Sequence, residues 1–284
     1  TWDDTLGKDF KYNISLNGSY NKNEVGNIPT SDGIIHGAGD ELYNNASEFY
    51  RAENGQPIGY FWGYKTAGIF QNTQEIDEWR AAGNGILQSN VQPGDVRFVD
   101  RNHDGQINDK DKVNLGNGTP DFTLGLNLGF VYKGFDFSIV ANGAFGQQIV
   151  QSYRNHTRPT PNYTTAILDR WHGEGTSNRI PRVTDSNINY QFSDLFIQNG
   201  DYLRLSTLTL GYDFAKLFKG KAVSQARLYF QVQNLFIITG YDGMDPEIGF
   251  GSSNNSWVSG LDYGYYPRPR TVLVGVNLDR KSVV

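Results

Sequence analysis

The chain has 284 residues, a formal net charge of -5 and no cysteine. Its apolar character comes largely from 17 tyrosines and 17 phenylalanines, set among 33 glycines, a bias typical of many strands joined by turns. The negative charge argues against nucleic-acid binding, and the absence of cysteine excludes disulfides and thiol chemistry. The sequence has no apolar run of about 18 residues, so it predicts no transmembrane helix.

The first elements predicted along the chain are strands. Apolar and polar residues alternate in 10–25 ("FKYNISLNGSYNKNEV"), which indicates a strand with two different faces. Two further aromatic-rich runs, 48–53 ("EFYRAE") and 58–70 ("IGYFWGYKTAGIF"), predict another pair of strands. The connection 54–57 ("NGQP") predicts a short turn between that pair.

A short helix is predicted next, over residues 73–83 ("TQEIDEWRAAG"). Acidic residues in its first turns and Arg80 near its end suit the helix dipole. Gly83 can adopt the left-handed conformation that ends a helix.

Residues 100–111 ("DRNHDGQINDKD") have the spacing of an EF-hand calcium loop without the flanking helices. Oxygen donors fall at positions 1, 3, 5, 7, 9 and 12 of that pattern: Asp100, Asn102, Asp104, the Gln106 carbonyl, Asn108 and Asp111. Gly105 permits the sharp turn, and Ile107 can anchor the loop. Because aspartate replaces the usual glutamate at the last position, we expect weak binding of one structural Ca²⁺, with Asp100, Asn102, Asp104, Gln106 and Asp111 as ligands. An Asp/Asn/Gly-rich turn without metal is the alternative.

The clearest local pattern is a hairpin, with strands of about 11 to 13 residues on either side of Lys133-Gly134. Strict alternation over this length, against the usual ~5 to 6 residues, is typical of a transmembrane β-barrel. One set of side chains is expected to face lipid: Leu124, Leu126, Leu128, Phe137 and Ile139. The other set is expected to face inward: Asn127, Asp136 and Asn142.

Three more strands are predicted, over 201–214, 226–239 and 270–278. In the first of them the apolar residues move from odd to even positions, from Leu203 and Leu205 to Leu208 and Leu210. A β-bulge near Ser206-Thr207 would account for that shift.

Connections alternate between long and short. The long ones run over about 26–47, 71–119, 148–200 and 240–269, and the short ones over 54–57, 133–134 and 215–225. Outer-membrane barrels have long extracellular loops and short periplasmic turns. The sequence therefore predicts an antiparallel transmembrane barrel segment of about eight strands, with the long loops on one side. A secreted β-sandwich or jelly roll is the alternative fold.

The sequence contains no GxSxG motif, no P-loop and no GxGxxG in the context of a strand, so we predict no catalytic or cofactor-binding residues and no enzyme. A β-rich glycosidase or lyase is the weaker alternative. The four histidines, His36, His103, His156 and His172, have no close metal-ligand spacing. Loop aromatics could stack on sugar rings or simply pack within the loops: Trp171, Trp257, Tyr263, Tyr265 and Tyr266.

An ordered set of segments resembles the C-terminal part of the SusC/RagA family, TonB-linked outer-membrane transporters of Bacteroidetes-type bacteria. The set is "GYFWGYKTAGIFQN", "PGDVRFVDRNHDGQINDKDK", "LGNGTPDFTLGLNLGFVYKGFDFSIVANGAFG", "GDYLRLSTLTLGYDF", "QNLFIITGYDGMDPE" and "YPRPRTVLVGVNL". The segments occur in the family's order and cover nearly the whole chain.

The resemblance implies that residues 1–284 are the C-terminal part of a barrel of about 22 strands, with 71–119 as an extracellular loop insertion carrying the calcium-type loop. It implies import of glycan or peptide fragments across the outer membrane of a Gram-negative bacterium. A SusD-like surface lipoprotein would be a partner, and TonB would act through the family's N-terminal region, which this sequence lacks. The alternative function is a secreted, calcium-stabilised carbohydrate-binding β-domain.

Overall fold

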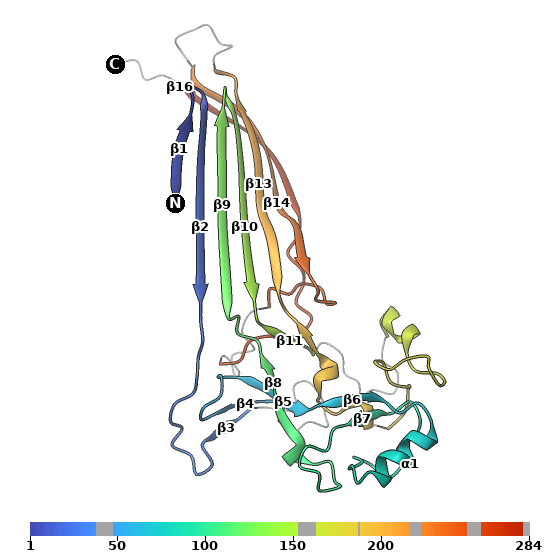
Figure 1. The fold of residues 1–284 in the computed structure, drawn as a ribbon. Helices are drawn as coiled ribbons and strands as arrows, with labels where there is room; N and C mark the ends of the chain where they lie inside the picture. The colour runs from blue at the N-terminus through green and yellow to red at the C-terminus, as the bar shows by residue number, and fades with distance from the viewer. Residues whose placement is uncertain (38–47, 153–162, 187, 216–222, 249–256, 281–284) are drawn as a thin grey trace.

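The protein is described by a computed structural model that covers residues 1–37, 48–152, 163–186, 188–215, 223–248 and 257–280. Its dominant feature is a tall antiparallel sheet whose seven strands lie in the order β1-β2-β9-β10-β13-β14-β16 (Figure 1). These strands are β1 (Trp2–Leu6), β2 (Phe10–Tyr20), β9 (Phe122–Tyr132), β10 (Phe135–Phe145), β13 (Tyr202–Asp213), β14 (Val223–Thr239) and β16 (Thr271–Arg280). No helix in the described part of the chain is long and apolar enough to cross a membrane.

All long excursions lie together at one end of this sheet, where they form what we call the loop domain, the described residues of 21–121, 146–201 and 240–270 (Figure 1). One of its sheets joins β3 (Ile34–His36), β4 (Tyr50–Glu53), β5 (Tyr60–Tyr64) and β8 (Lys112–Asn117). Smaller sheets pair β6 (Thr66–Ile69) with β7 (Val96–Phe98), and β11 (Gln148–Gln151) with β12 (Ile197–Asn199) and β15 (Leu261–Asp262). Helix α1 (Thr73–Ala81) and the 3-10 turns η1 (Asp109–Asp111), η2 (Thr165–Asp169), η3 (Ile188–Tyr190) and η4 (Asp194–Phe196) complete it.

The predicted hairpin is confirmed, and its register sorts side chains onto two faces. Leu126 lies opposite Leu16 and Ala141, whereas Asn127 lies opposite Ser15 and Val140. Directly opposed residues share a face of an antiparallel sheet, so each pairing extends the pattern across the strands. The apolar face thus carries Tyr12, Ile14, Leu126, Leu128, Phe130, Phe137, Ile139, Leu208, Leu210, Phe230, Val232 and Val274. The polar face carries Asn13, Asn17, Asn127, Asp136, Ser138, Asn142, Thr209 and Gln231.

On the polar face, glycine makes room for an ion pair that crosses a whole strand. Asp136 of β10 accepts from Arg227 of β14, with distances of 2.8 Å to Nε and 2.5 Å to Nη2. Gly211 of β13 lies between them, and a Cβ there would come within 2.4 Å of the Asp136 carboxylate. A side chain at position 211 would therefore displace the pair.

The predicted β-bulge is confirmed at Ser206. The register of β13 skips this residue, because Leu205 pairs with Ala141 and Thr207 pairs with Val140 on β10. The extra residue brings Leu205 and Leu208 to the same apolar face, although they differ in parity. Ser206 donates its hydroxyl to the side-chain oxygen of Asn142.

The predicted helix is also confirmed, with an end at Ala81. Asn72 caps its first turn, because its side-chain oxygen accepts the backbone N–H of Glu75 at 2.9 Å. Gly83 follows the C-cap with φ +83°, a conformation that costs other residues steric strain.

The prediction that 48–53 and 58–70 are barrel strands is wrong. Both runs belong to the loop domain: the first contains β4 of four residues, and the second is divided into β5 of five residues and β6 of four (Figure 1). The turn at 54–57 lies there too. A membrane-spanning strand needs about 9–11 residues. Tyr50 and Phe61 are fully buried, so these strands serve a packed core and not a lipid-facing wall.

The other connections follow the predicted sides. The described residues of 71–119, 148–200 and 240–269 lie at the loop-domain end, and Lys133-Gly134 lies at the opposite end (Figure 1). The turn predicted at 215–225 falls mostly on 216–222, which lie outside the described residues.

One hydrophobic core unites the three excursions. Phe49 and Phe61 come from the first, Val150 and Phe192 from the second, and Val258 and Leu261 from the third. Because each excursion supplies buried side chains to the same cluster, the loops stabilise one another as a domain.

Candidate metal centre in the loop domain

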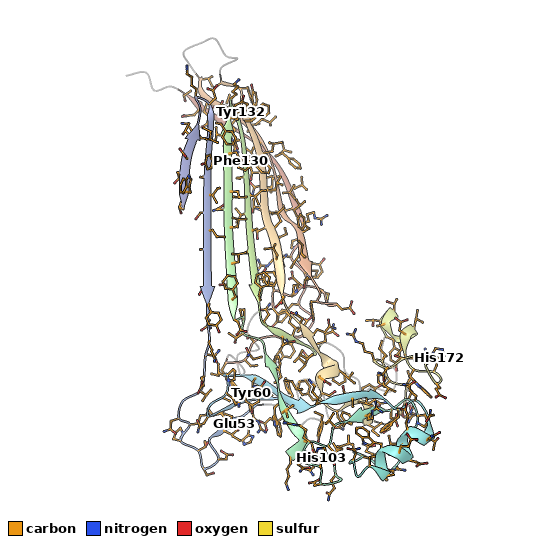
Figure 2. All side chains as sticks on the ribbon, in the orientation of Figure 1. Glu53, Tyr60, His103, Phe130, Tyr132 and His172 are labelled. Carbon is orange, nitrogen blue, oxygen red and sulfur yellow. The ribbon has the colours of Figure 1, made fainter. Side chains whose placement is uncertain are left out.

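The calcium-type loop lies between β7 and β8, at the end of the loop domain remote from the tall sheet. Figure 2 marks it by His103. The chain reverses direction through two left-handed residues, His103 with φ +55° and Gly105 with φ +76°. The turn predicted for Gly105 is therefore present.

Asp100, the first predicted ligand, is buried with 1% of its surface exposed. Its Oδ2 atom accepts two backbone N–H groups, from Gly85 and from Gly105, each at 2.9 Å. Its Oδ1 atom is buried and has no hydrogen-bond partner among the described residues. A buried carboxylate oxygen without a partner is uncommon in proteins and calls for an explanation.

The middle of the loop is arranged by Asx-type turns. The side-chain oxygen of Asn102 accepts the N–H of Asp104 at 3.1 Å, and Oδ1 of Asp104 accepts the N–H of Gln106 at 2.9 Å. Asn102 also donates its amide to Oδ2 of Asp104 at 2.9 Å. Asp104 is solvent-exposed, so its carboxylate can rotate without disturbing packed neighbours.

Asp111 closes the loop from a fully buried position. Its carboxylate accepts the N–H of Arg101 at 2.8 Å and that of Asn108 at 2.9 Å. Asn108 in turn caps η1. Its side chain accepts backbone N–H groups within this turn, while the Asp111 side chain accepts the backbone N–H of Asn108.

The predicted ligands share one loop but do not form a finished coordination sphere. Across the described residues, no three His, Cys, Asp or Glu side chains are grouped closely enough to hold a metal ion. Calcium binding thus stays a prediction, supported by the turn and by the free Oδ1 of Asp100. Of the histidines, His156 lies outside the described residues, and His172 lies near η2 (Figure 2).

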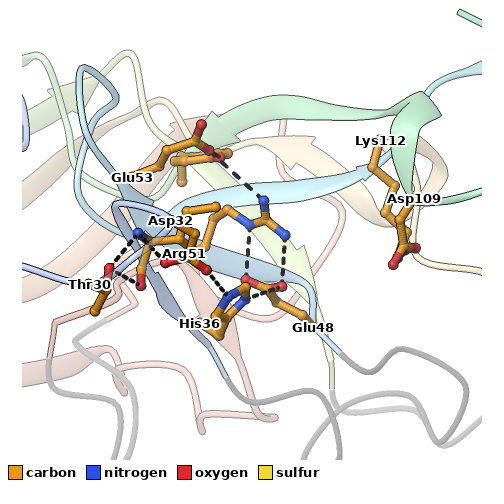
Figure 3. A network of polar contacts seen from close by, with 10 residues as sticks. Thr30, Asp32, His36, Glu48, Arg51, Glu53, Asp109 and Lys112 are labelled. Carbon is orange, nitrogen blue, oxygen red and sulfur yellow. Dashed lines mark hydrogen bonds and ion pairs between the residues drawn. The ribbon is translucent and has the colours of Figure 1, made fainter. Parts of the chain in front are cut away.

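A second polar network surrounds Arg51 on β4 (Figure 3). Its guanidinium binds Glu48 in two places, at 2.9 Å from Nε and 2.8 Å from Nη2, and lies 3.4 Å from the ring centre of Trp62. His36 joins the network from β3, with Nδ1 at 2.9 Å from Glu48 and Nε2 at 3.2 Å from Asp32. The network therefore links β3 to β4 through side chains.

This network predicts a pH-dependent contact between β3 and β4. The hydrogen bond to Glu48, and then that to Asp32, raise the pKa of His36 above its ordinary 6.5, although partial burial and, to a smaller extent, the charge of Arg51 oppose them. A raised folded-state pKa means that the stabilisation is complete below 6.5 and is lost as pH rises through the folded value. We expect hydrogen exchange of the β3 amides, corrected for intrinsic rates, to show more opening at pH 8 than at pH 6, and His36→Gln to remove the difference. An unchanged pH dependence in that variant would contradict the assignment.

Sequence reasoning missed a charged cluster at the junction of the tall sheet and the loop domain. Buried Arg204 donates from Nη2 to Asp245 at 2.6 Å, and its Nε lies 3.0 Å from Glu247. Glu247 also binds Arg268 at 2.7 Å. Arg204 lies within a strand of alternating residues, and nothing in that local pattern indicates that its partner is Asp245, 41 residues further along the chain.

One cavity opens at the junction of the tall sheet and the loop domain, and a second opens within the loop domain. One of about 370 Å³ lies beside this cluster, lined by Asn142, Tyr202 and Glu247 among others. The other, of about 440 Å³, lies in the second excursion between Ile167, Arg179 and Gln198. Both have the size of small-ligand pockets, and neither was expected from the sequence.

The loop aromatics divide between packing and exposure. Trp257 packs on Tyr50 with ring centres 5.0 Å apart, and Tyr263 lies against the same core. Trp171 is partly buried and donates its indole N–H to Gln71 at 3.2 Å. Tyr266 is 87% exposed and Tyr265 is 42% exposed, so these are the two of the five predicted aromatics that present much ring surface to a ligand.

Comparison with known proteins gives relatives over nearly the whole chain, although no family model matches it. TonB-dependent receptor P3 of Formosa agariphila is 31% identical over 283 residues, a span of 95% of this chain and 27% of that protein. TonB-dependent receptor SusC of Bacteroides thetaiotaomicron is 29% identical over 273 residues, covering 95% of this chain and 24% of SusC. The chain therefore spans about a quarter of the length of these relatives.

Solved structures give the same fold. The RagAB peptide transporter superposes on 97% of the chain with a TM-score of 0.70 and 20% identity, over 28% of the length of that protein. The RagAB peptide importer in its closed-closed state gives a TM-score of 0.68 at 19% identity, again over 97% of the chain. The predicted antiparallel barrel fold is thereby confirmed, with seven strands in the described tall sheet in place of about eight.

Proposed function

The chain is homologous to one portion of the TonB-dependent receptors of the SusC/RagA type, and on this premise we propose that it forms part of an outer-membrane nutrient transporter. Its tall sheet would be a section of the barrel wall, and its loop domain would stand on the cell surface. The relatives are named as receptors, so we propose transport and not catalysis.

The observation that carries this proposal is the two-faced tall sheet. β9 and β10 have 11 residues each and β13 has 12, enough to cross the hydrocarbon layer of an outer membrane. The apolar face of the tall sheet is left open to the surroundings: Leu16 on β2 is 63% exposed, Leu210 on β13 48% and Val274 on β16 72%. A lipid-facing wall accounts for such a surface, whereas a secreted carbohydrate-binding domain would have to expose it to water.

The two outermost strands of the sheet support the same proposal. β1 and β16 each have one neighbour in the tall sheet of the described chain. Unpaired backbone groups are not tolerated in lipid, so in a membrane both edges must pair with further strands. The rest of a protein as long as the relatives would supply those strands.

The loop domain is the proposed contact region for cargo and for a SusD-like surface lipoprotein. The cavity of about 440 Å³ within it, and the cavity of about 370 Å³ at its junction with the tall sheet, suit fragments of a glycan or a peptide. The RagAB structure is described as a peptide transporter, which supports peptide fragments as one class of cargo. TonB would act through the region that corresponds to the rest of the relatives.

Peptide tags on intact cells test the proposed orientation in the native polypeptide that contains this chain. A tag between Asn54 and Gly55, both exposed in the loop domain, should bind antibody on intact cells. A tag between Lys133 and Gly134, at the other end of the tall sheet, should bind antibody only after the outer membrane is permeabilised. Equal labelling of both tags on intact cells would contradict the proposal.

A further inference from the structure

We propose that residues 100–111 bind one calcium ion through the free Oδ1 atom of Asp100, and that the ion fixes the chain segment that follows α1. The proposal goes beyond transport and does not depend on where the protein resides.

The main observation in favour of a bound cation is the buried carboxylate of Asp100. Its Oδ2 atom is satisfied by two backbone N–H groups, while Oδ1 is buried and has no donor among the residues that the structure describes. Desolvating a negatively charged oxygen without a partner is unfavourable, and a bound cation removes that cost. Because Gly105 of the loop is one of the two donors, the carboxylate is held against the turn that carries the other predicted ligands.

The chemistry of the loop favours calcium. Asp100, Asp104 and Asp111 supply carboxylates, and Gln106 and Asn102 supply neutral oxygens. Each carboxylate oxygen can accept more than one interaction, so the backbone N–H groups on Asp104 and Asp111 leave capacity for a metal. An all-oxygen set suits Ca²⁺ better than Zn²⁺, which prefers nitrogen and sulfur, or Mg²⁺, which demands a near-ideal octahedron.

Gly85 connects the loop to the end of α1. Its N–H donates to Asp100, and a Cβ at this position would come within 2.6 Å of the Gln106 backbone. Its carbonyl accepts the indole N–H of Trp79 at 3.1 Å. An ion on Asp100 therefore stabilises the contact that positions Gly85, and Trp79 on α1 responds to its presence.

Calcium titration of the native polypeptide containing this chain, purified in detergent and stripped with chelator, tests the proposal. We expect one ion per molecule, with a dissociation constant of about 10⁻⁴ to 10⁻³ M, as in extracellular calcium modules. Asp104→Asn should weaken binding by more than about tenfold, because it removes an exposed ligand charge without touching the core. Asp109→Asn is the matched control, since Asp109 pairs with Lys112 at 2.8 Å and is not a predicted ligand, and its affinity should stay within about twofold.

Tryptophan fluorescence gives the second readout. Calcium should change the emission of the wild type, and Trp79→Phe should lose most of that change while retaining calcium affinity. The proposed site does not exist if the calcium titration, followed by calorimetry, detects no binding at 10 mM Ca²⁺, about tenfold above the expected range. Equal calcium affinity of Asp104→Asn and wild type would also contradict it. Calcium binding without any contribution of Trp79 to the signal would overturn the link to α1.

Discussion

Arginine in place of Leu126 should destabilise the assembled barrel by about 2 to 4 kcal/mol, whereas arginine in place of Asn127 should cost less than about 1 kcal/mol. Leu126 lies mid-strand on the apolar face, between Leu16 and Ala141, where a charge would have to enter lipid. Asn127 lies on the polar face beside Ser15, where an added guanidinium can remain hydrated or bind neighbouring oxygens.

Reversible unfolding in denaturant, from lipid vesicles, measures both variants against wild type. Leu126→Ala separates the effect of charge from the loss of packing, because it removes the side chain without adding a charge. Similar losses for Leu126→Arg and Asn127→Arg would show that the two faces do not see different surroundings.

Replacing Asp95 by alanine should release the first two excursions of the loop domain from each other, at a cost of about 3 kcal/mol. The fully buried Asp95 carboxylate binds Arg182 at 2.7 and 3.2 Å and Asn189 at 3.1 Å. Its loss leaves a guanidinium and a buried amide without their acceptor. We place the cost at the lower end of the range for broken buried pairs, because the Arg182 side chain keeps 23% of its surface exposed.

Hydrogen exchange of the Val96 amide measures this opening, because Val96 donates to Asn189 at 2.8 Å. Asp77→Ala is the matched control: it removes an exposed partner 3.9 Å from Arg80, and such pairs are worth less than about 1 kcal/mol. Val96 protection that stays at the wild-type level in Asp95→Ala would show that the contact does not hold the excursions together.

The sequence predicted those elements whose structure depends on residues close together in the chain. The hairpin around Lys133-Gly134 was predictable because alternation and a tight turn act on neighbouring residues. The bulge at Ser206 was predictable because only an extra residue keeps Leu205 and Leu208 on one face. Helix α1 was predictable from its charges and from Gly83.

Other strands were assigned wrongly or missed, because their place in the fold depends on contacts with residues far away in the sequence. Residues 60–64 ("YFWGY") have the composition of a barrel strand, yet Tyr60 and Phe61 are buried in the loop domain. Their brevity and lack of alternation were the available signals, and composition outweighed them in the prediction. Strand β1 was missed because its sequence, "WDDTL", has little alternation and pairs only through its neighbour β2.

In the candidate metal site, too, local features were predicted from the sequence and a contact with a distant residue was not. Spacing alone predicted the turn at Gly105 and selected Asp100 as the first ligand. It gave no sign of Gly85, which reaches Asp100 from 15 residues away and completes the environment of its carboxylate. A contact of this kind depends on how α1 and β7 pack, which periodicity does not encode.

Single spin labels on 126, 127 and 128 offer the most direct measurement of the central claim, that the tall sheet is a membrane wall with lipid on its apolar face. The chain contains no cysteine, so each introduced cysteine is the sole labelling site within it. In lipid vesicles, labels at 126 and 128 should be accessible to oxygen dissolved in the bilayer, and the label at 127 to a water-soluble nickel reagent. Loss of this alternation, with all three labels equally open to the nickel reagent, would contradict the account.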